Sequence, residues 1–124
     1  MSFEDIKKDF EKVDKEVQQE LPIYKSMMSK CNELIEKYET CLEENTSMNP
    51  SVCMKEENAK DTCVSKNLCP QEYINYQLCL QGDKSKCRDK RIQLVQCQQN
   101  IWLQIDKLTK EIWKKYKANK DWDL

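Results

Sequence analysis

One cysteine spacing, repeated four times, constrains this chain more than any other feature. The eight cysteines form four consecutive C-x9-C pairs, with eleven, five and seven residues between successive pairs. A fixed spacing that recurs in this way indicates a repeated structural unit, so residues 31–63 and 69–97 are interpreted as two copies of one unit. The pairs are Cys31 and Cys41, Cys53 and Cys63, Cys69 and Cys79, and Cys87 and Cys97.

On a helix this spacing places both cysteines of a pair on one face, because ten residues are one heptad plus the step from an a to a d position. If two such helices pack antiparallel, the first cysteine of one lies opposite the second cysteine of the other. A bridge within one pair is excluded on a continuous helix, because the two Cα atoms would lie about 15 Å apart and a disulfide allows about 7 Å. The predicted disulfides are therefore nested: Cys31–Cys63 outside Cys41–Cys53, and Cys69–Cys97 outside Cys79–Cys87.

The composition favours an all-α fold that depends on these disulfides. The 124 residues include one glycine and three prolines, and 35% of them are charged. The heptad positions between the cysteines are also mostly polar, so the helix seams cannot drive packing unaided. Each disulfide stabilises the fold by roughly 3 kcal/mol in the loop-entropy estimate, less where bridges are nested. The disulfides thus substitute for a large apolar core.

Local signals place the helices and their ends. We expect an amphipathic helix over residues 2–20, a helix from about Ile23 to Glu44, a return helix capped by Asn49 and started by Pro50, and a helix opened by Pro70. Gly82 suits a left-handed position after that helix, Asp83 or Ser85 caps the next one, and the last helix runs from about Lys84 to Ala118. The predicted units are residues 1–22 (N-terminal helix), 23–67 and 68–98 (two hairpins), and 99–124 (C-terminal helix and tail).

Other uses of the cysteines fit the sequence poorly. Zinc and iron–sulfur sites usually need closely spaced C-x2-C ligand pairs, and a thiol oxidoreductase needs a comparable pair with an activated thiolate. A copper carrier needs adjacent cysteines outside the disulfides. The chain contains none of these pairs, and it has no histidine to serve as ligand or general base. We therefore expect no cofactor, no metal site and no catalytic residues.

Repeated C-x9-C helical hairpins resemble the CHCH (coiled-coil-helix–coiled-coil-helix) family. The resemblance implies residence in the mitochondrial intermembrane space, where a disulfide relay oxidises such chains after import without a cleaved presequence. Tyr38, Tyr76 and Leu94, each three residues before a cysteine, match the apolar residue typical of relay substrates, although packing in the helix seam explains them equally well. Two consecutive units, above all CPQEYINYQLC and CRDKRIQLVQC, are similar to the double-CHCH accessory subunits of respiratory complex I.

Two apolar stripes outside the hairpins are the predicted partner interface. The N-terminal stripe follows a regular a/d spacing, and the C-terminal stripe forms an arc wider than one neighbouring helix can cover. Exposed apolar patches of this kind usually mark interfaces. The interface residues are Phe3, Ile6, Phe10, Val13, Val17, Ile101, Trp102, Ile105, Leu108, Ile112, Trp113 and Tyr116.

Three explanations of these stripes remain open. Residues 1–20 carry a net charge of −3 and residues 101–124 a net charge of +2, so the two arms could fold onto each other. They could instead, or in addition, dock into a large assembly. They could also lie on a membrane surface, but the mixture of lysines and acids on the polar faces disfavours this third explanation.

The sequence thus predicts a non-catalytic accessory subunit of an inner-membrane respiratory complex, complex I before complex IV or ATP synthase. It would be peripheral to the membrane, because no apolar run approaches the roughly 18 residues of a membrane span, and soluble and unprocessed, because the N-terminus lacks a signal-peptide core. Its net charge of −1 gives no general footprint for nucleic acid. A soluble assembly factor or metallochaperone, and a subunit of a mitochondrial ribosome or membrane-organising complex, are the alternatives.

Overall fold

The structure is a computed structural model that describes residues 2–45 and 49–119. Within these ranges it contains helices and no strand, which confirms the all-α class with two disulfide-stapled hairpins and a long C-terminal helix. The elements are α1 (Phe3–Glu20), α2 (Pro22–Glu44), the 3-10 turn η1 (Pro50–Cys53), α3 (Met54–Leu68), α4 (Pro70–Leu80), the 3-10 turn η2 (Lys84–Lys86) and α5 (Arg88–Asn119).

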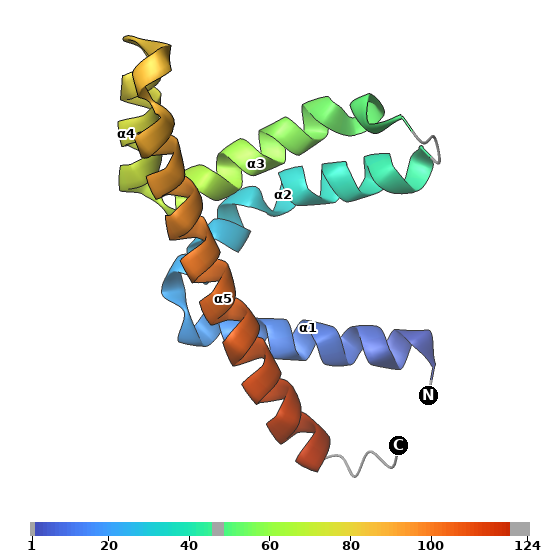
Figure 1. The fold of residues 1–124 in the computed structure, drawn as a ribbon. Coiled ribbons are helices and arrows are strands. Elements are labelled where there is room, and N and C mark those ends of the chain that lie inside the picture. Colours follow the sequence, from blue (N-terminus) through green and yellow to red (C-terminus); the bar gives the residue numbers. More distant parts are fainter. Residues whose placement is uncertain (1, 46–48, 120–124) are drawn as a thin grey trace.

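Helix α5 is the spine of the molecule (Figure 1). Its first part pairs with α4 to form the second hairpin, and its later turns pack against α1. The first hairpin, α2 with α3, and the helix α1 extend from α5 toward the same side as two separate branches. One long helix therefore holds the two halves of the chain together.

Two prolines set the sharp bends of the chain. Leu21 and Cys69 each precede a proline and have non-helical backbone angles, with φ of −122° and −134°. The residue before a proline is pushed out of the helical region, while the proline itself is suited to the first turn of the next helix. As a result α1 ends where α2 begins, and α3 ends where α4 begins.

The four disulfides join the cysteines in the nested pairs predicted from the spacing. Their Cα–Cα distances lie between 5.7 and 6.3 Å, within the ordinary range. The outer bridges lie at the roots of the hairpins, near α5, where Cys31 and Cys69 are fully buried. The inner bridges lie near the turns. The pairs are Cys31–Cys63, Cys41–Cys53, Cys69–Cys97 and Cys79–Cys87.

A small core lies where α1, the root of the first hairpin and α5 meet. Met27 of α2 is completely buried and Leu68 of α3 is 1% exposed. Side chains from α1 and α5 complete this one cluster, whereas α4 contributes no buried residue of its own. The members are Val13, Val17, Tyr24, Met27, Cys31, Val64, Leu68, Cys69, Leu94, Ile105 and Ile112.

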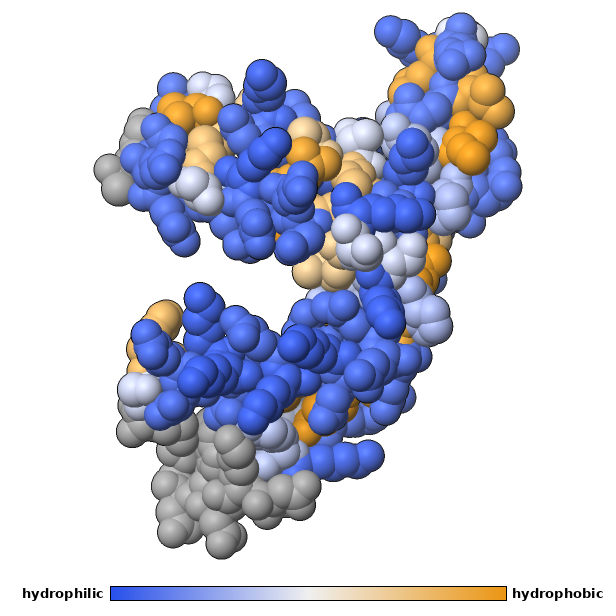
Figure 2. Space-filling model, turned by 180° about the vertical axis from the view of Figure 1, so that it is seen from behind, coloured by the Kyte–Doolittle hydropathy of each residue, from blue (hydrophilic) through white to orange (hydrophobic). Residues whose placement is uncertain are grey.

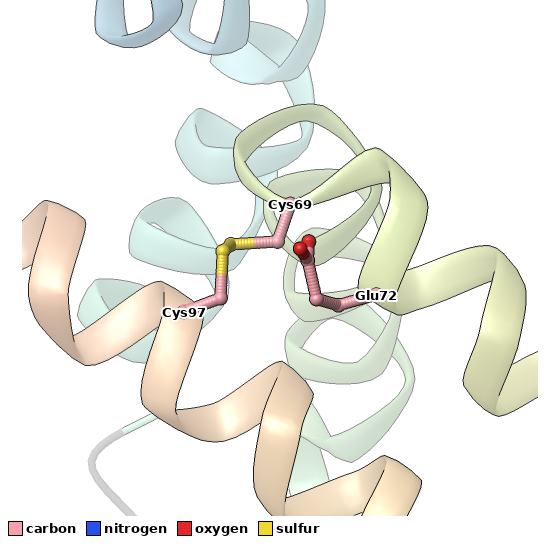
Figure 3. A group of neighbouring side chains, drawn as sticks. All are labelled: Cys69, Glu72 and Cys97. Atoms are coloured by element: carbon pink, nitrogen blue, oxygen red, sulfur yellow. A yellow bond between two sulfur atoms is a disulfide. The ribbon is translucent and has the colours of Figure 1, made fainter.

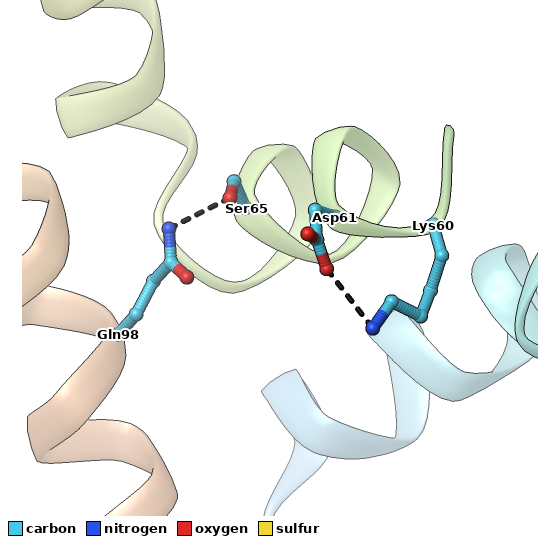
Figure 4. Close-up of polar contacts among 4 residues, drawn as sticks. All are labelled: Lys60, Asp61, Ser65 and Gln98. Carbon is cyan, nitrogen blue, oxygen red and sulfur yellow. Dashed lines mark hydrogen bonds and ion pairs between the residues drawn. The ribbon is translucent and has the colours of Figure 1, made fainter. Parts of the chain in front are cut away.

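Polar contacts also join the helices away from this core (Figure 4). The side-chain amide of Gln98 on α5 donates a 2.7 Å hydrogen bond to the hydroxyl of Ser65 on α3 and so links the two hairpins. Where α3 faces α2, the ammonium of Lys60 lies 4.4 Å from the ring centre of Tyr38 on α2 and 3.0 Å from the carboxylate of its neighbour Asp61. These seams fit the expectation that the disulfides, and not apolar packing, hold the hairpins closed.

Both return helices start with the same capped turn. The side-chain oxygen of Asn49 accepts hydrogen bonds from the amide and hydroxyl of Ser51, at 3.1 and 2.7 Å. Asp83 accepts the same two bonds from Ser85, at 3.1 and 2.6 Å. Each turn is a 3-10 segment that leads into the inner cysteine and then into the α-helix. The internal repeat thus includes an Asx-x-Ser-x-Cys motif at residues 49–53 and 83–87.

The prediction for Gly82 was wrong. The residue follows the end of α4, but its φ lies outside the left-handed region, and an added Cβ would meet only the carbonyl of Cys79 at an ordinary 3.6 Å. The physical reason is that Gln81 stays helical and the cap of Asp83 redirects the chain. The turn therefore needs no left-handed residue. The last α-helix also begins at Arg88, because Lys84–Lys86 form the 3-10 turn.

Candidate interaction surfaces

All eight cysteines are consumed in disulfides, so no thiol remains for chemistry. In the described residues one group has the geometry of a metal cluster, because the sulfurs of Cys69 and Cys97 and a carboxylate oxygen of Glu72 lie within 4.8 Å of one another. Figure 3 shows that the two sulfurs are bonded to each other. A cysteine binds a metal ion through its thiolate, and a disulfide contains no thiolate. This group is therefore a disulfide with a carboxylate beside it.

The structure brings the two predicted stripes together. Val13 and Val17 of α1 and Ile105 and Ile112 of α5 are buried in the shared core. Farther along, the rings of Phe10 and Trp113 meet edge-on with centroids 5.0 Å apart. The central residues of the two stripes are therefore buried by the folding of α1 onto α5 within the same chain.

A polar contact fixes the ends of the two arms. Asp9 of α1 is only 4% exposed, and its carboxylate accepts a 2.5 Å hydrogen bond from the hydroxyl of Tyr116 on α5. The ring of Tyr116 also packs edge-on against Trp113. A buried carboxylate is costly unless it is hydrogen-bonded, so this contact sets the position of α1 along α5. The sequence analysis missed Asp9, because its position at the edge of the apolar stripe resembles that of any solvated acid.

A second polar contact lies where α1 turns into α2. The hydroxyl of Tyr24 donates a 2.5 Å hydrogen bond to the carboxylate of Asp14, which also accepts a 2.7 Å bond from the amide of Gln18. Burial raises the pKa of Tyr24 well above its usual value, and the hydrogen bond to Asp14 raises it further. The hydroxyl therefore stays protonated as a donor and ties the two helices together.

Only four of the twelve predicted interface residues are exposed in the folded chain. Exposed members lie at the N-terminal end of α1 and on α5 at Trp102, whose ring meets that of Tyr24 on α2 edge-on with centroids 6.3 Å apart. The others are buried or half-buried within the chain. The exposed members are Phe3, Ile6, Phe10 and Trp102; the half-buried ones are Ile101, Leu108, Trp113 and Tyr116; the buried ones are Val13, Val17, Ile105 and Ile112.

Another apolar row was missed in the sequence analysis. Ile92, Val95 and Leu103 lie on the outer face of α5, and Leu103 is 66% exposed. They are three and eight residues apart, so they share one side of the helix, and the adjacent Trp102 extends the row. The sequence carries this signal only weakly, because Ile92 and Val95 lie within the hairpin between Cys87 and Cys97, next to the seam residue Leu94.

Smaller apolar patches lie on the hairpins, and Figure 2 shows them as orange areas in a largely hydrophilic surface. One is on α4, where Ile74 and Leu78 are exposed one turn apart, and the other is near the tip of the first hairpin, at Leu42 and Val52. Such isolated pairs are common on protein surfaces. They are weaker indications of an interface than the row on α5.

Two of the hollows on the surface differ in the charge of their lining residues. One, of about 700 Å³, lies along the first hairpin and is lined by acidic residues, among them Glu33, Glu36 and Glu56. The other, of about 540 Å³, lies between α1 and the last turns of α5 and combines apolar with basic side chains. Within residues 2–45 and 49–119, no helix has the length and apolar character that crossing a membrane requires.

The exposed apolar row and the two hollows lie on helices that the disulfides hold in place. Comparison with protein-family models, with curated proteins and with solved structures finds no match to this chain.

Proposed function

We propose that this chain is a non-catalytic accessory subunit of a mitochondrial inner-membrane respiratory complex, complex I being the first candidate, on its intermembrane-space side. The observation that carries the proposal is the exposed apolar row on α5, Ile92, Val95 and Leu103, on a helix stapled at its root by Cys69–Cys97. Large apolar side chains on a rigid helix are suited to a groove or helix of a neighbouring protein. The subunit would clamp its neighbours through this row.

The cysteine chemistry supports the compartment. Disulfides persist in oxidising compartments and are rare where thiols are kept reduced, and this chain holds four of them in two C-x9-C hairpins. Such hairpins resemble CHCH proteins, whose usual compartment is the intermembrane space. The disulfide relay of that compartment is the partner we propose during import.

The lack of histidine and of free cysteine supports a structural and non-catalytic role. The chain has no histidine, and all its cysteine sulfurs are in disulfides, so the usual general base and the usual thiolate nucleophile are both missing. A metallochaperone is disfavoured for the same reason, because Cys69 and Cys97 could bind a metal only after reduction of their bridge.

Native gels of mitochondria that contain the tagged protein test this proposal. The wild-type chain should comigrate with a respiratory complex, and the identity of that complex distinguishes complex I from complex IV and ATP synthase. Leu103→Glu should strongly reduce comigration, because it places a charge in the apolar row. Leu42→Glu is the matched control, since Leu42 is also half-exposed but lies at the tip of the first hairpin.

Two results would contradict the proposal. The first is a wild-type chain that runs only as a soluble monomer. The second is a Leu103→Glu variant that folds, as judged by its helical circular dichroism, and comigrates as completely as the Leu42→Glu control. Comigration with a ribosomal subunit would instead support one of the alternative assemblies.

A further inference from the structure

The hollow between α1 and the last turns of α5 is lined by three apolar side chains and three lysines. Its apolar side consists of Ile6 and Phe10 from α1 and Trp113 from α5. Its other lining residues are three lysines from α5, Lys110, Lys114 and Lys117. These lysines follow one another at steps of four and three residues, so they form a row along one side of the helix.

Among residues 2–45 and 49–119, no acidic residue lines this hollow, which we call the lysine groove. Lys110 forms a 2.9 Å ion pair with Asp106, one turn away, but both side chains are well exposed, and such surface pairs are worth little. Glu111 lies elsewhere and lines a different hollow near Glu20. The mixed charge of the arms, which argued against a membrane surface, is therefore sorted in the folded protein.

We propose that the lysine groove docks on the surface of an anionic phospholipid bilayer. In this arrangement the aromatic and aliphatic side chains enter the boundary between headgroups and acyl chains, and the three ammonium groups pair with lipid phosphates. Long lysine side chains place their methylene groups along apolar surface while their charges stay in water. Basic residues beside exposed Trp and Phe are typical of peripheral membrane contacts.

Neighbouring residues extend the same pattern. Phe3, at the start of α1, is 80% exposed. It lies on the same side of α1 as Phe10, since the two residues are seven apart. Between them, Lys7 is exposed and four residues from Phe3, while the exposed acids Glu4 and Glu11 lie three and four residues from Lys7, so the positive charge of the tip comes from α5. The tip formed by α1 and the end of α5 thus presents apolar rings beside the lysines of α5.

The choice of basic residue favours a lipid surface over an acidic protein segment. Arginine binds protein carboxylates in a fixed two-bond geometry and is enriched at protein interfaces. The two arginines of this chain, Arg88 and Arg91, lie at the other end of α5. Lysine is a flexible point charge, and that is suited to headgroups that move laterally.

The proposal deepens the proposed function, since it assigns different ends of α5 to different contacts. The helix has 32 residues, or about 48 Å at 1.5 Å per residue. With the lysine groove on the bilayer, the second hairpin lies at the far end of this spine, where it can reach a neighbouring subunit. The lipid contact can be tested without any such subunit.

Vesicle sedimentation with the purified, oxidised full chain is the test. The protein should bind phosphatidylcholine–phosphatidylglycerol vesicles, bind pure phosphatidylcholine vesicles weakly, and dissociate at high salt. The variant K110Q/K114Q/K117Q should lower the partition coefficient by roughly a hundredfold, since each lysine near an anionic surface contributes about fivefold. Glutamine keeps helix propensity nearly unchanged, so the variant should fold.

The matched control is K84Q/K86Q/K90Q, which removes the same charge from the turn η2 and the first turn of α5, at the other end of the molecule. This variant should bind the vesicles nearly as well as the wild type. Phe10→Ser, at a residue that is 57% exposed, should weaken binding several-fold through the apolar contact. The proposal is overturned if the wild type does not bind anionic vesicles, if it binds neutral vesicles equally well, or if the control loses as much as the groove variant. Because the assay contains no other protein, these outcomes are independent of comigration with a respiratory complex.

Discussion

The two hairpins are built on the same staple but stand in different surroundings. Each has an outer and an inner disulfide, and each starts its return helix with an Asx-x-Ser-x-Cys turn. The first hairpin places Met27 and Leu68 in the core, whereas α4 of the second buries no residue. The second hairpin instead extends α5 far beyond its last cysteine. The two hairpins therefore share their disulfides and their capped turns, but they differ in how many side chains they bury.

The largest expected effect comes from removing disulfides. Replacing Cys31 and Cys63 by serine should cost about 4 kcal/mol of unfolding free energy, because this bridge closes the longest loop. Replacing Cys79 and Cys87 should cost about 2.5 kcal/mol, because only eight residue steps separate them. Urea unfolding of the oxidised variants measures both values. Equal losses would show that loop length does not govern the staples.

Core packing should distinguish the hairpins almost as clearly. Met27→Ala should destabilise the protein by about 3 kcal/mol, since it leaves a cavity at a completely buried site. Leu78→Ala on α4 removes a side chain that is 60% exposed, so its effect should stay within about 0.5 kcal/mol. The two urea midpoints provide the comparison. A comparable loss for Leu78 would mean that the second hairpin has a core of its own.

The extension of α5 should respond more locally. Tyr116→Phe removes the hydroxyl that hydrogen-bonds buried Asp9 and should cost about 1–3 kcal/mol. Hydrogen exchange should show the loss mainly as faster exchange in α1, with little change in α2 and α3. Tyr73→Phe on α4, which removes the same group elsewhere, is the control. A uniform loss of protection in both variants would contradict a local role for this contact.

The pairing of the cysteines was predictable because it depends on one local rule, the ten-residue step along a helix. The caps at Asn49 and Asp83 were also predictable, because a cap acts within three residues of itself. Both kinds of signal survive in any folded arrangement of the hairpins. They therefore carry over from sequence to structure without knowledge of the rest of the fold.

The placement of the hairpins and of α1 was not predictable in the same way. It depends on single contacts between distant residues, such as Gln98 with Ser65 and Tyr116 with Asp9, the latter 107 positions apart. No periodic pattern marks such pairs. The charge sorting in the lysine groove has the same origin, because it arises only when α1 lies along α5. Composition alone gives the net charges of the two arms but not which charged side chains line the groove between them.

The smallest expected effect is a difference between the two capped turns in their response to pH. The hydrogen bond from the Ser85 hydroxyl, with that from the Ser85 amide, holds the pKa of Asp83 below its ordinary value of 3.8. A lowered pKa in the folded state means that the cap is at full strength above the ordinary pKa and is lost as pH falls through the lower one. Asn49 carries no charge and should keep its cap throughout. In an acid titration followed by NMR, the Ser85 amide should shift while the Ser51 amide stays in place, and Asp83→Asn should abolish the difference. If both amides shift together in the wild type, the acid response belongs to the whole fold and not to one turn.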